Sequence, residues 1–137
     1  MARGAERFFS AIPVEDTAER QLAVTAELQA HHPDFLRLFY LLSMERTDDA
    51  AVAAVVRQVR DTAIARFGDA VRGLLPAGVD AARAERIVAD LTAFAVAQSD
   101  GIFYARHLEP EATDVARMYQ MLWRAVTALI PTMLEEP

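Results

Sequence analysis

The stretch FAVAQSDGIF, residues 94–103, decides the fold that we predict for this chain. Its middle segment, QSDG at 98–101, has the residue types of a turn, and a Gly in a helix interior costs about 1 kcal/mol relative to Ala. The apolar spacing nevertheless continues across the segment, from Phe94 through Gln98 to Ile102 and Ala105. The sequence therefore predicts one unbroken helix that Asp80 caps and that runs to about Leu108.

Helical spacing recurs through the rest of the chain, whereas the period-two alternation of strands is missing. Proline residues and Asp-rich turns divide the pattern into separate segments. We therefore expect an all-α fold, a single domain over residues 1–137 with about six helices in an orthogonal or antiparallel bundle. The expected helices cover about 2–11, 16–32, 33–46, 47–75, 80–108 and 113–133.

Composition limits the classes of protein to which the chain can belong. It has 137 residues, no Cys and a net charge of −6, and all 14 of its basic residues are Arg. The lack of Cys excludes disulfides and zinc–thiolate sites. An acidic domain is a poor partner for nucleic acid by itself. The charged first residues and the short apolar runs predict neither a signal peptide nor a membrane span, so we expect a cytoplasmic protein.

Two of the expected helices are more apolar than an outer helix needs to be. The helix at 33–46 has apolar residues on all sides, so we expect its neighbours to enclose it at the centre of the domain. The last helix has one apolar stripe for the domain's own core and a second that continues through Met121, Ala125 and Ala128. A buried core helix of a monomer is one explanation of the second stripe, and a partner subunit is the other.

A partner subunit also accounts for Gly101. A Gly inside a continuing helix lets another backbone come close, and the small residues of the last helix suit such a crossing. Two long helices doubled by a two-fold axis form an intermolecular four-helix bundle. We therefore expect a homodimer, with an interface at Gly101, Tyr104, Met118, Met121, Leu122, Ala125 and Ala128.

Several of these segments together resemble the C-terminal domain of TetR-type transcriptional regulators. Residues 33–38, which open a buried helix, look like the central helix of that family. Residues 94–103 look like its penultimate helix, and the turn at Glu109-Pro110 precedes a similar amphipathic last helix. The resemblance implies that the last two helices dimerise and that the preceding helices enclose a small-molecule pocket.

The N-terminus departs from the family pattern. The family has a helix-turn-helix DNA-binding domain of roughly fifty residues before this region, and here only residues 1–12 precede Pro13. We therefore expect no contact with nucleic acid through this chain alone.

The expected pocket lies between the helices at 33–46, 47–75 and 80–108. Its lining is mostly apolar with a few polar groups, as is usual for small-molecule sites, and the expected effector is an apolar or aromatic small molecule. The alternative is that the same side chains fill a dry core. The predicted lining is Phe39, Tyr40, Leu42, Ser43, Val56, Val59, Arg60, Phe67, Leu91, Phe94 and Gln98.

Metal binding and catalysis find little support in the sequence. Glu27 and His31 are one helical turn apart and could share an ion, but helix-end histidines explain them more simply. No phosphate loop, nucleophile elbow or His-Glu-x-x-His motif is present. We therefore expect neither an enzyme nor a cofactor or metal protein.

Two functional hypotheses remain from the sequence. The first is a homodimeric, small-molecule-sensing regulatory domain of TetR type without its own DNA-binding head. The second is a ligand-free helical dimerisation module that pairs with another regulator.

Overall fold

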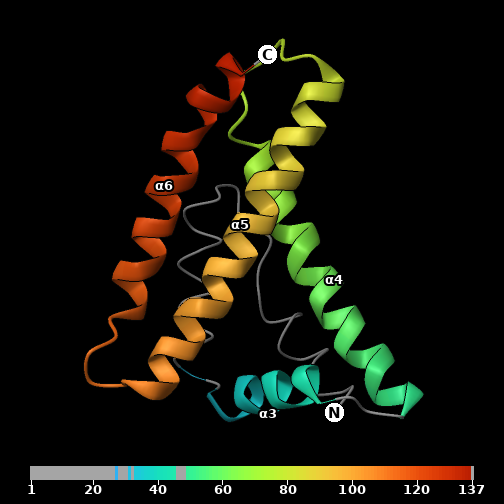
Figure 1. Cartoon of the computed structure of the whole chain (residues 1–137), viewed down its shortest axis with the longest axis vertical. Helices are drawn as coiled ribbons and strands as arrows, with labels where there is room; N and C mark the ends of the chain where they lie inside the picture. Colours follow the sequence, from blue (N-terminus) through green and yellow to red (C-terminus); the bar gives the residue numbers. More distant parts are fainter. Residues whose placement is uncertain (1–26, 28–30, 32, 46–48, 137) are drawn as a thin grey trace.

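The computed structural model describes residues 27, 31, 33–45 and 49–136, and this part of the chain is helical without strands. It contains four α-helices: α3 (Pro33–Met44), α4 (Ala50–Arg72), α5 (Ala81–Leu108) and α6 (Val115–Glu135) (Figure 1). The all-α prediction is confirmed. The count of six helices is not, because the helices predicted at 2–11 and 16–32 fall almost wholly outside the described residues.

The starts of the three long helices follow from their capping residues. Asp49 accepts hydrogen bonds from the backbone N–H groups of Ala51 and Val52, at 2.9 and 3.2 Å. Asp80 and Asp114 cap α5 and α6 in the same way. Each side chain accepts a hydrogen bond from the backbone N–H group three residues later, that of Arg83 and that of Arg117. A carboxylate in this position satisfies an otherwise unpaired helix N–H. The predicted starts of α5 and α6 and the unbroken course of α5 through Gly101 are confirmed.

The three long helices run alternately up and down, and α5 contacts both of the others (Figure 1). A turn with Gly78 in the left-handed region, at φ +88°, joins α4 to α5. The shorter α3 lies across the end of the molecule where α5 ends and α6 begins (Figure 1). The end of α5 is therefore close to α3, and the start of α5 is close to the end of α4.

The main core lies between α5, α6 and the last turns of α4. Tyr119 is its most enclosed large side chain, at 1% exposed. The other buried members are Val71, Ile87, Val88, Leu91, Ala95, Ile102, Leu122, Val126 and Ile130. Burial of this continuous apolar surface is the main stabilising term for the bundle.

A smaller cluster joins α3 to α4, and it corrects the prediction that the 33–46 helix is central. Phe39 and Val59 are its buried members. Leu38 and Leu41 are exposed, and Met44 is 70% exposed. The helix lies at one end of the bundle and, among the described elements, packs mainly on α4. The apolar character of α3 did not predict its place at the end of the bundle, because hydrophobic periodicity identifies the apolar faces of a helix but not the elements that pack on them.

Candidate functional site

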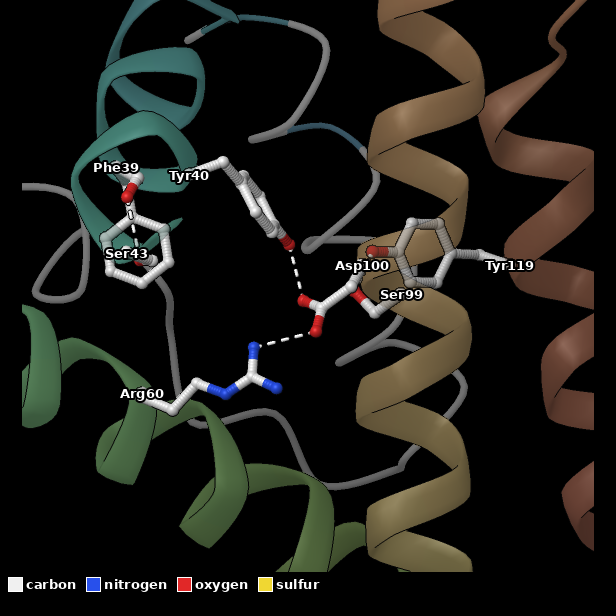
Figure 2. A network of polar contacts seen from close by, with 7 residues as sticks. All are labelled: Phe39, Tyr40, Ser43, Arg60, Ser99, Asp100 and Tyr119. Carbon is white, nitrogen blue, oxygen red and sulfur yellow. Dashed lines mark hydrogen bonds and ion pairs between the residues drawn. The ribbon is translucent and has the colours of Figure 1, made fainter. Parts of the chain in front are cut away.

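The carboxylate of Asp100 connects three helices (Figure 2). The Tyr40 hydroxyl of α3 donates a hydrogen bond to its Oδ1 atom, at 2.5 Å. Arg60 Nη1 of α4 lies 2.7 Å from its Oδ2 atom, as a hydrogen bond and an ion pair. Asp100 itself belongs to α5. One carboxylate thus holds two helices that are 40 and 60 residues away in the sequence.

The Tyr40 ring is held by two aromatic neighbours. It stacks on Phe103 of α5 with centroids 4.3 Å apart and an interplanar angle of 13°. Phe39 meets it edge-on at 5.5 Å. Burial raises the pKa of Tyr40 well above its usual value, and the hydrogen bond to Asp100 raises it further. The hydroxyl therefore remains protonated and donates to the carboxylate.

Ser99, the residue before Asp100, makes its contact with another helix. Its Oγ lies 2.5 Å from the hydroxyl of Tyr119 in α6, and both residues are buried. Successive residues of a helix project about 100° apart, so neighbours can reach different helices. The polar segment in the middle of α5 is thus explained as a junction between α3, α4 and α6.

Sequence reasoning did not assign Ser99, Asp100 or Tyr119 to a site. It did single out the 98–101 segment as polar within an apolar helix. A buried Ser beside a half-buried Asp in such a place needs partners on neighbouring helices, and that requirement is the signal that could have identified the site.

The structure brings together part of the predicted pocket lining. Phe39, Tyr40, Val56 and Val59 belong to the α3–α4 cluster, and Arg60 reaches the same junction through Asp100. Leu42 and Ser43 are on the same helix as Phe39, and the Ser43 hydroxyl donates to the Phe39 carbonyl.

The remaining predicted pocket residues lie elsewhere. Leu91 is buried in the main core, with Phe67 packed against it. Phe94 is 36% exposed, and Gln98 is also exposed. These placements correct the prediction for Phe94 and Gln98. The buried line of α5 includes Leu91, Ala95 and Ile102, as the predicted stripe does. Between them it passes through Ser99 instead of Gln98, a difference of one position or about 100° around the helix.

Among the described residues, an open groove with a volume of about 700 Å³ lies between α4 and α5. This volume lies within the range of roughly 300–1,000 Å³ that small-molecule sites occupy. Arg60 is the predicted pocket residue that also lines this groove. The groove therefore differs from the predicted pocket.

Cross-helix ion pairs lie at the two ends of the groove. Arg60 pairs with Asp100 at one end. At the other end Arg72 lies 3.3 Å from Glu85 of α5 and 3.2 Å from Asp69 of its own helix. At 1.5 Å per residue, Arg60 and Arg72 are about 18 Å apart along α4. Between them the groove has mostly small side chains, namely Ala65, Gly68, Ala89, Ala93 and Ala97.

The floor of the groove contains one polar side chain. Thr92 is 5% exposed, and its hydroxyl has no hydrogen-bond partner among the described residues. A buried hydroxyl without a partner costs about 1–3 kcal/mol. Gly68 lies opposite, where an added Cβ would be 3.6 Å from Thr92 Oγ1 and 3.9 Å from Val88 Cγ1. Both are ordinary contacts, so packing does not require a glycine there.

The predicted dimer residues divide into exposed and buried ones. Gly101 and Ala128 are exposed, as are Tyr104 at 57%, Met121 at 59% and Met118, while Ala125 is partly buried. Leu122 is 5% exposed and belongs to the core of its own chain, which corrects its assignment to the interface. It follows Tyr119 by three positions and precedes Val126 by four, so it lies on the buried face of α6.

Gly101 does not lie at a helix crossing within the chain. None of the described residues lies within 4 Å of the position that a Cβ would take there. A close approach of α6 to Gly101 inside one subunit is therefore wrong, and a contact with a second subunit stays a prediction. Gly68, which is buried against α5, is the glycine at a helix–helix contact.

The residues proposed for a metal ion are explained by a local contact. His31 Nδ1 lies 2.7 Å from the backbone carbonyl oxygen of Glu27. No group of three or more histidine or carboxylate side chains is placed to hold a metal within the described residues. Within the same residues, none of the helices combines the length and the hydropathy that a membrane crossing requires.

Neither protein-family models nor curated proteins give a significant match to this sequence.

Proposed function

We propose that this chain is a homodimeric, small-molecule-sensing regulatory domain, similar to the C-terminal domains of TetR-type regulators. The observation that carries the proposal is the set of exposed apolar side chains on α5 and α6, which we call the apolar stripe. The proposal assigns neither catalysis nor nucleic-acid binding to this chain.

The α6 part of the stripe supports the homodimer most directly. Met118, Met121 and Leu129 are all exposed, and Ala125 and Ala128 lie between them at helical spacing. This spacing places them on one face, and Arg117 and Arg124, four positions before and three positions after Met121, lie at the edge of that face. Exposed apolar patches of this kind mark interaction sites in soluble proteins.

Phe94 and Tyr104 add two exposed aromatic side chains on α5. A second copy of the chain has the same stripe, so a two-fold axis would place the stripes of the two subunits against each other. The two subunits would then contribute α5 and α6 each to a four-helix arrangement.

The sensing part of the proposal is supported by the position of α5. This helix lines the groove, carries Asp100 and contributes to the apolar stripe, so a change at one place can reach the others. A ligand that alters the separation of α4 and α5 would act on the Arg60–Asp100 contact. Because Gly101 follows Asp100 directly, that contact lies beside the proposed interface.

Two measurements test the proposal. Sedimentation equilibrium of the chain is expected to give a dimer, and a monomer at all concentrations would contradict the proposed assembly. Thermal-shift screening against apolar and aromatic metabolites is expected to find a stabilising ligand. A compound at about 100 times its dissociation constant adds about 2.7 kcal/mol to the free energy of unfolding.

A ligand-free dimerisation module is the second candidate function. The observation that favours it is the position of Leu91, which fills the core between α5 and α6 with Phe67 packed against it, although both were predicted to line a pocket. A dimer that no compound stabilises would support this second function.

A further inference from the structure

We infer that the groove between α4 and α5 binds an uncharged, elongated, mostly apolar small molecule that carries a hydrogen-bond acceptor. This inference rests on the proposed sensing function, because it names the site and the chemical class of the effector. It is carried by the shape of the groove, by the distribution of its charges and by the residues of its floor.

The shape of the groove follows from its small side chains. Gly68 and four alanines lie between the two ends, and they leave room above the line where α4 and α5 meet. The end groups Arg60 and Arg72 are roughly three helical turns apart, so the space is long and narrow. An elongated molecule would cover it, whereas a compact one would cover only part of it.

The charges of the groove favour a ligand without a net charge. Arg60 is paired with Asp100, and Arg72 is paired with Asp69 and Glu85. Each guanidinium at the ends therefore already has a carboxylate partner. A charged ligand would compete with the partners that these groups already have, whereas an uncharged apolar ligand would lie between the two pairs and leave both intact.

The floor supplies the hydrogen bond. Thr92 is nine-tenths buried, lines the groove and has no partner for its hydroxyl within the described part of the chain. A threonine in a helix has two accessible χ1 rotamers, so the hydroxyl can turn toward a bound molecule. Gly68 has no side chain to cover this point, although an alanine would fit there. Without a ligand, a valine in place of the threonine and an alanine in place of the glycine would both be more stable choices.

The test uses two fluorescent probes and the whole chain. Nile red is uncharged, elongated and has a carbonyl acceptor, whereas diphenylhexatriene is an elongated hydrocarbon without one. We expect the chain to bind both probes in fluorescence titrations. Ala93→Trp fills the groove from an exposed position and should lower both affinities at least tenfold. Ala116→Trp is the matched control, at an exposed position of α6 outside the groove, and should leave both affinities unchanged.

Thr92→Val tests the hydrogen bond separately. It should lower the affinity for Nile red at least threefold and leave that for diphenylhexatriene unchanged. Equal affinities of Ala93→Trp and the wild-type chain, or no binding of either probe, would overturn the groove assignment. An unchanged affinity of Thr92→Val for Nile red would overturn the role of the hydroxyl. If Ala93→Trp does not fold, Gly68→Ala replaces it, because an alanine fits the packing there. This variant should lower the affinity for both probes at least threefold, and unchanged affinities would overturn the site.

Sedimentation of the same samples separates this inference from the homodimer. If the chain is a monomer that binds the probes and Ala93→Trp abolishes this binding, the proposed dimer is overturned and the groove assignment stands. A dimer that binds neither probe overturns the groove alone. A metabolite that stabilises Ala93→Trp as much as the wild-type chain supports sensing at another site and contradicts the groove.

Discussion

Arg60 and Asp100, which are 40 residues apart in the sequence, form a 2.7 Å ion pair that connects α4 to α5. The same carboxylate accepts a hydrogen bond from Tyr40 on α3. The side chains of the pair are 42% and 31% exposed, so solvent screens their charges in part. The ion pair matters for the geometry of the fold, because it holds α4 and α5 together at one end of the groove.

Removal of the Asp100 carboxylate should destabilise the domain. Asp100→Ala removes one hydrogen bond and one partly exposed ion pair, so we expect a loss of about 1–2 kcal/mol in the free energy of unfolding. Asp90→Ala is the matched control, because Asp90 is an exposed residue of the same helix, and we expect a change within about 0.5 kcal/mol. Urea denaturation measures both values. Equal stabilities of the two variants would show that the junction does not hold the helices together.

The raised pKa of Tyr40 predicts a loss of stability at alkaline pH. The unfolded chain releases this proton near pH 10, whereas the folded chain retains it. The folded state therefore binds more protons above about pH 10, and its stability falls by up to about 1.4 kcal/mol per pH unit. Tyr40→Phe cannot titrate, so the difference in stability between wild type and variant should shrink as the pH rises from about 9 to about 11. A difference that stays constant over this range contradicts the shifted pKa.

A charge in the apolar stripe should prevent dimerisation. Met121→Glu places a carboxylate at a 59% exposed position of α6, so the fold of the single chain should tolerate it. In the dimer the carboxylate would lose its hydration, which costs several kcal/mol even though Arg117 and Arg124 lie one helical turn away. We expect monomers in sedimentation equilibrium and an unchanged circular dichroism spectrum. The matched control is Gln120→Glu, on the neighbouring exposed position outside the stripe, which should remain dimeric; monomers in both variants would indicate a general charge effect.

Gly101→Leu tests whether the interface includes the middle of α5. Because no described residue lies within 4 Å of the added Cβ, the substitution should not disturb the described part of the subunit. Replacing a helix-interior glycine by leucine should even raise helix propensity, by up to about 0.8 kcal/mol. If a second subunit approaches closely at Gly101, the variant should sediment as a monomer. A stable dimer of this variant would place the interface elsewhere on the stripe.

Several features of the fold could be predicted from short segments of the sequence. The starts of α5 and α6 could be predicted because the capping contacts are local, within three residues. Asp80 was the predicted cap of α5, and of the two candidates for α6, Thr113 and Asp114, the structure shows Asp114. The unbroken helix through Gly101 was predicted because helical spacing continues across it. The core face of α6 was predicted in part: Tyr119, Leu122, Val126 and Ile130 of its expected stripe are buried, whereas Met118 and Leu129 are exposed.

The candidate site depended on contacts that no local pattern contains. Phe94 and Gln98 were predicted one position out of register, and a single position turns a side chain by about 100°. The end position of α3 was also missed, because an apolar helix does not specify which neighbours cover it.

Capping and periodicity act between residues a few positions apart, so the sequence alone determined the long helices and most of their limits. The junction at Asp100 and the groove depend on how α3, α4 and α5 rotate and cross, and only the tertiary structure decided these. The physical reason is that helix packing selects one arrangement from many that bury similar apolar area, and polar contacts such as Arg60–Asp100 form only in that arrangement.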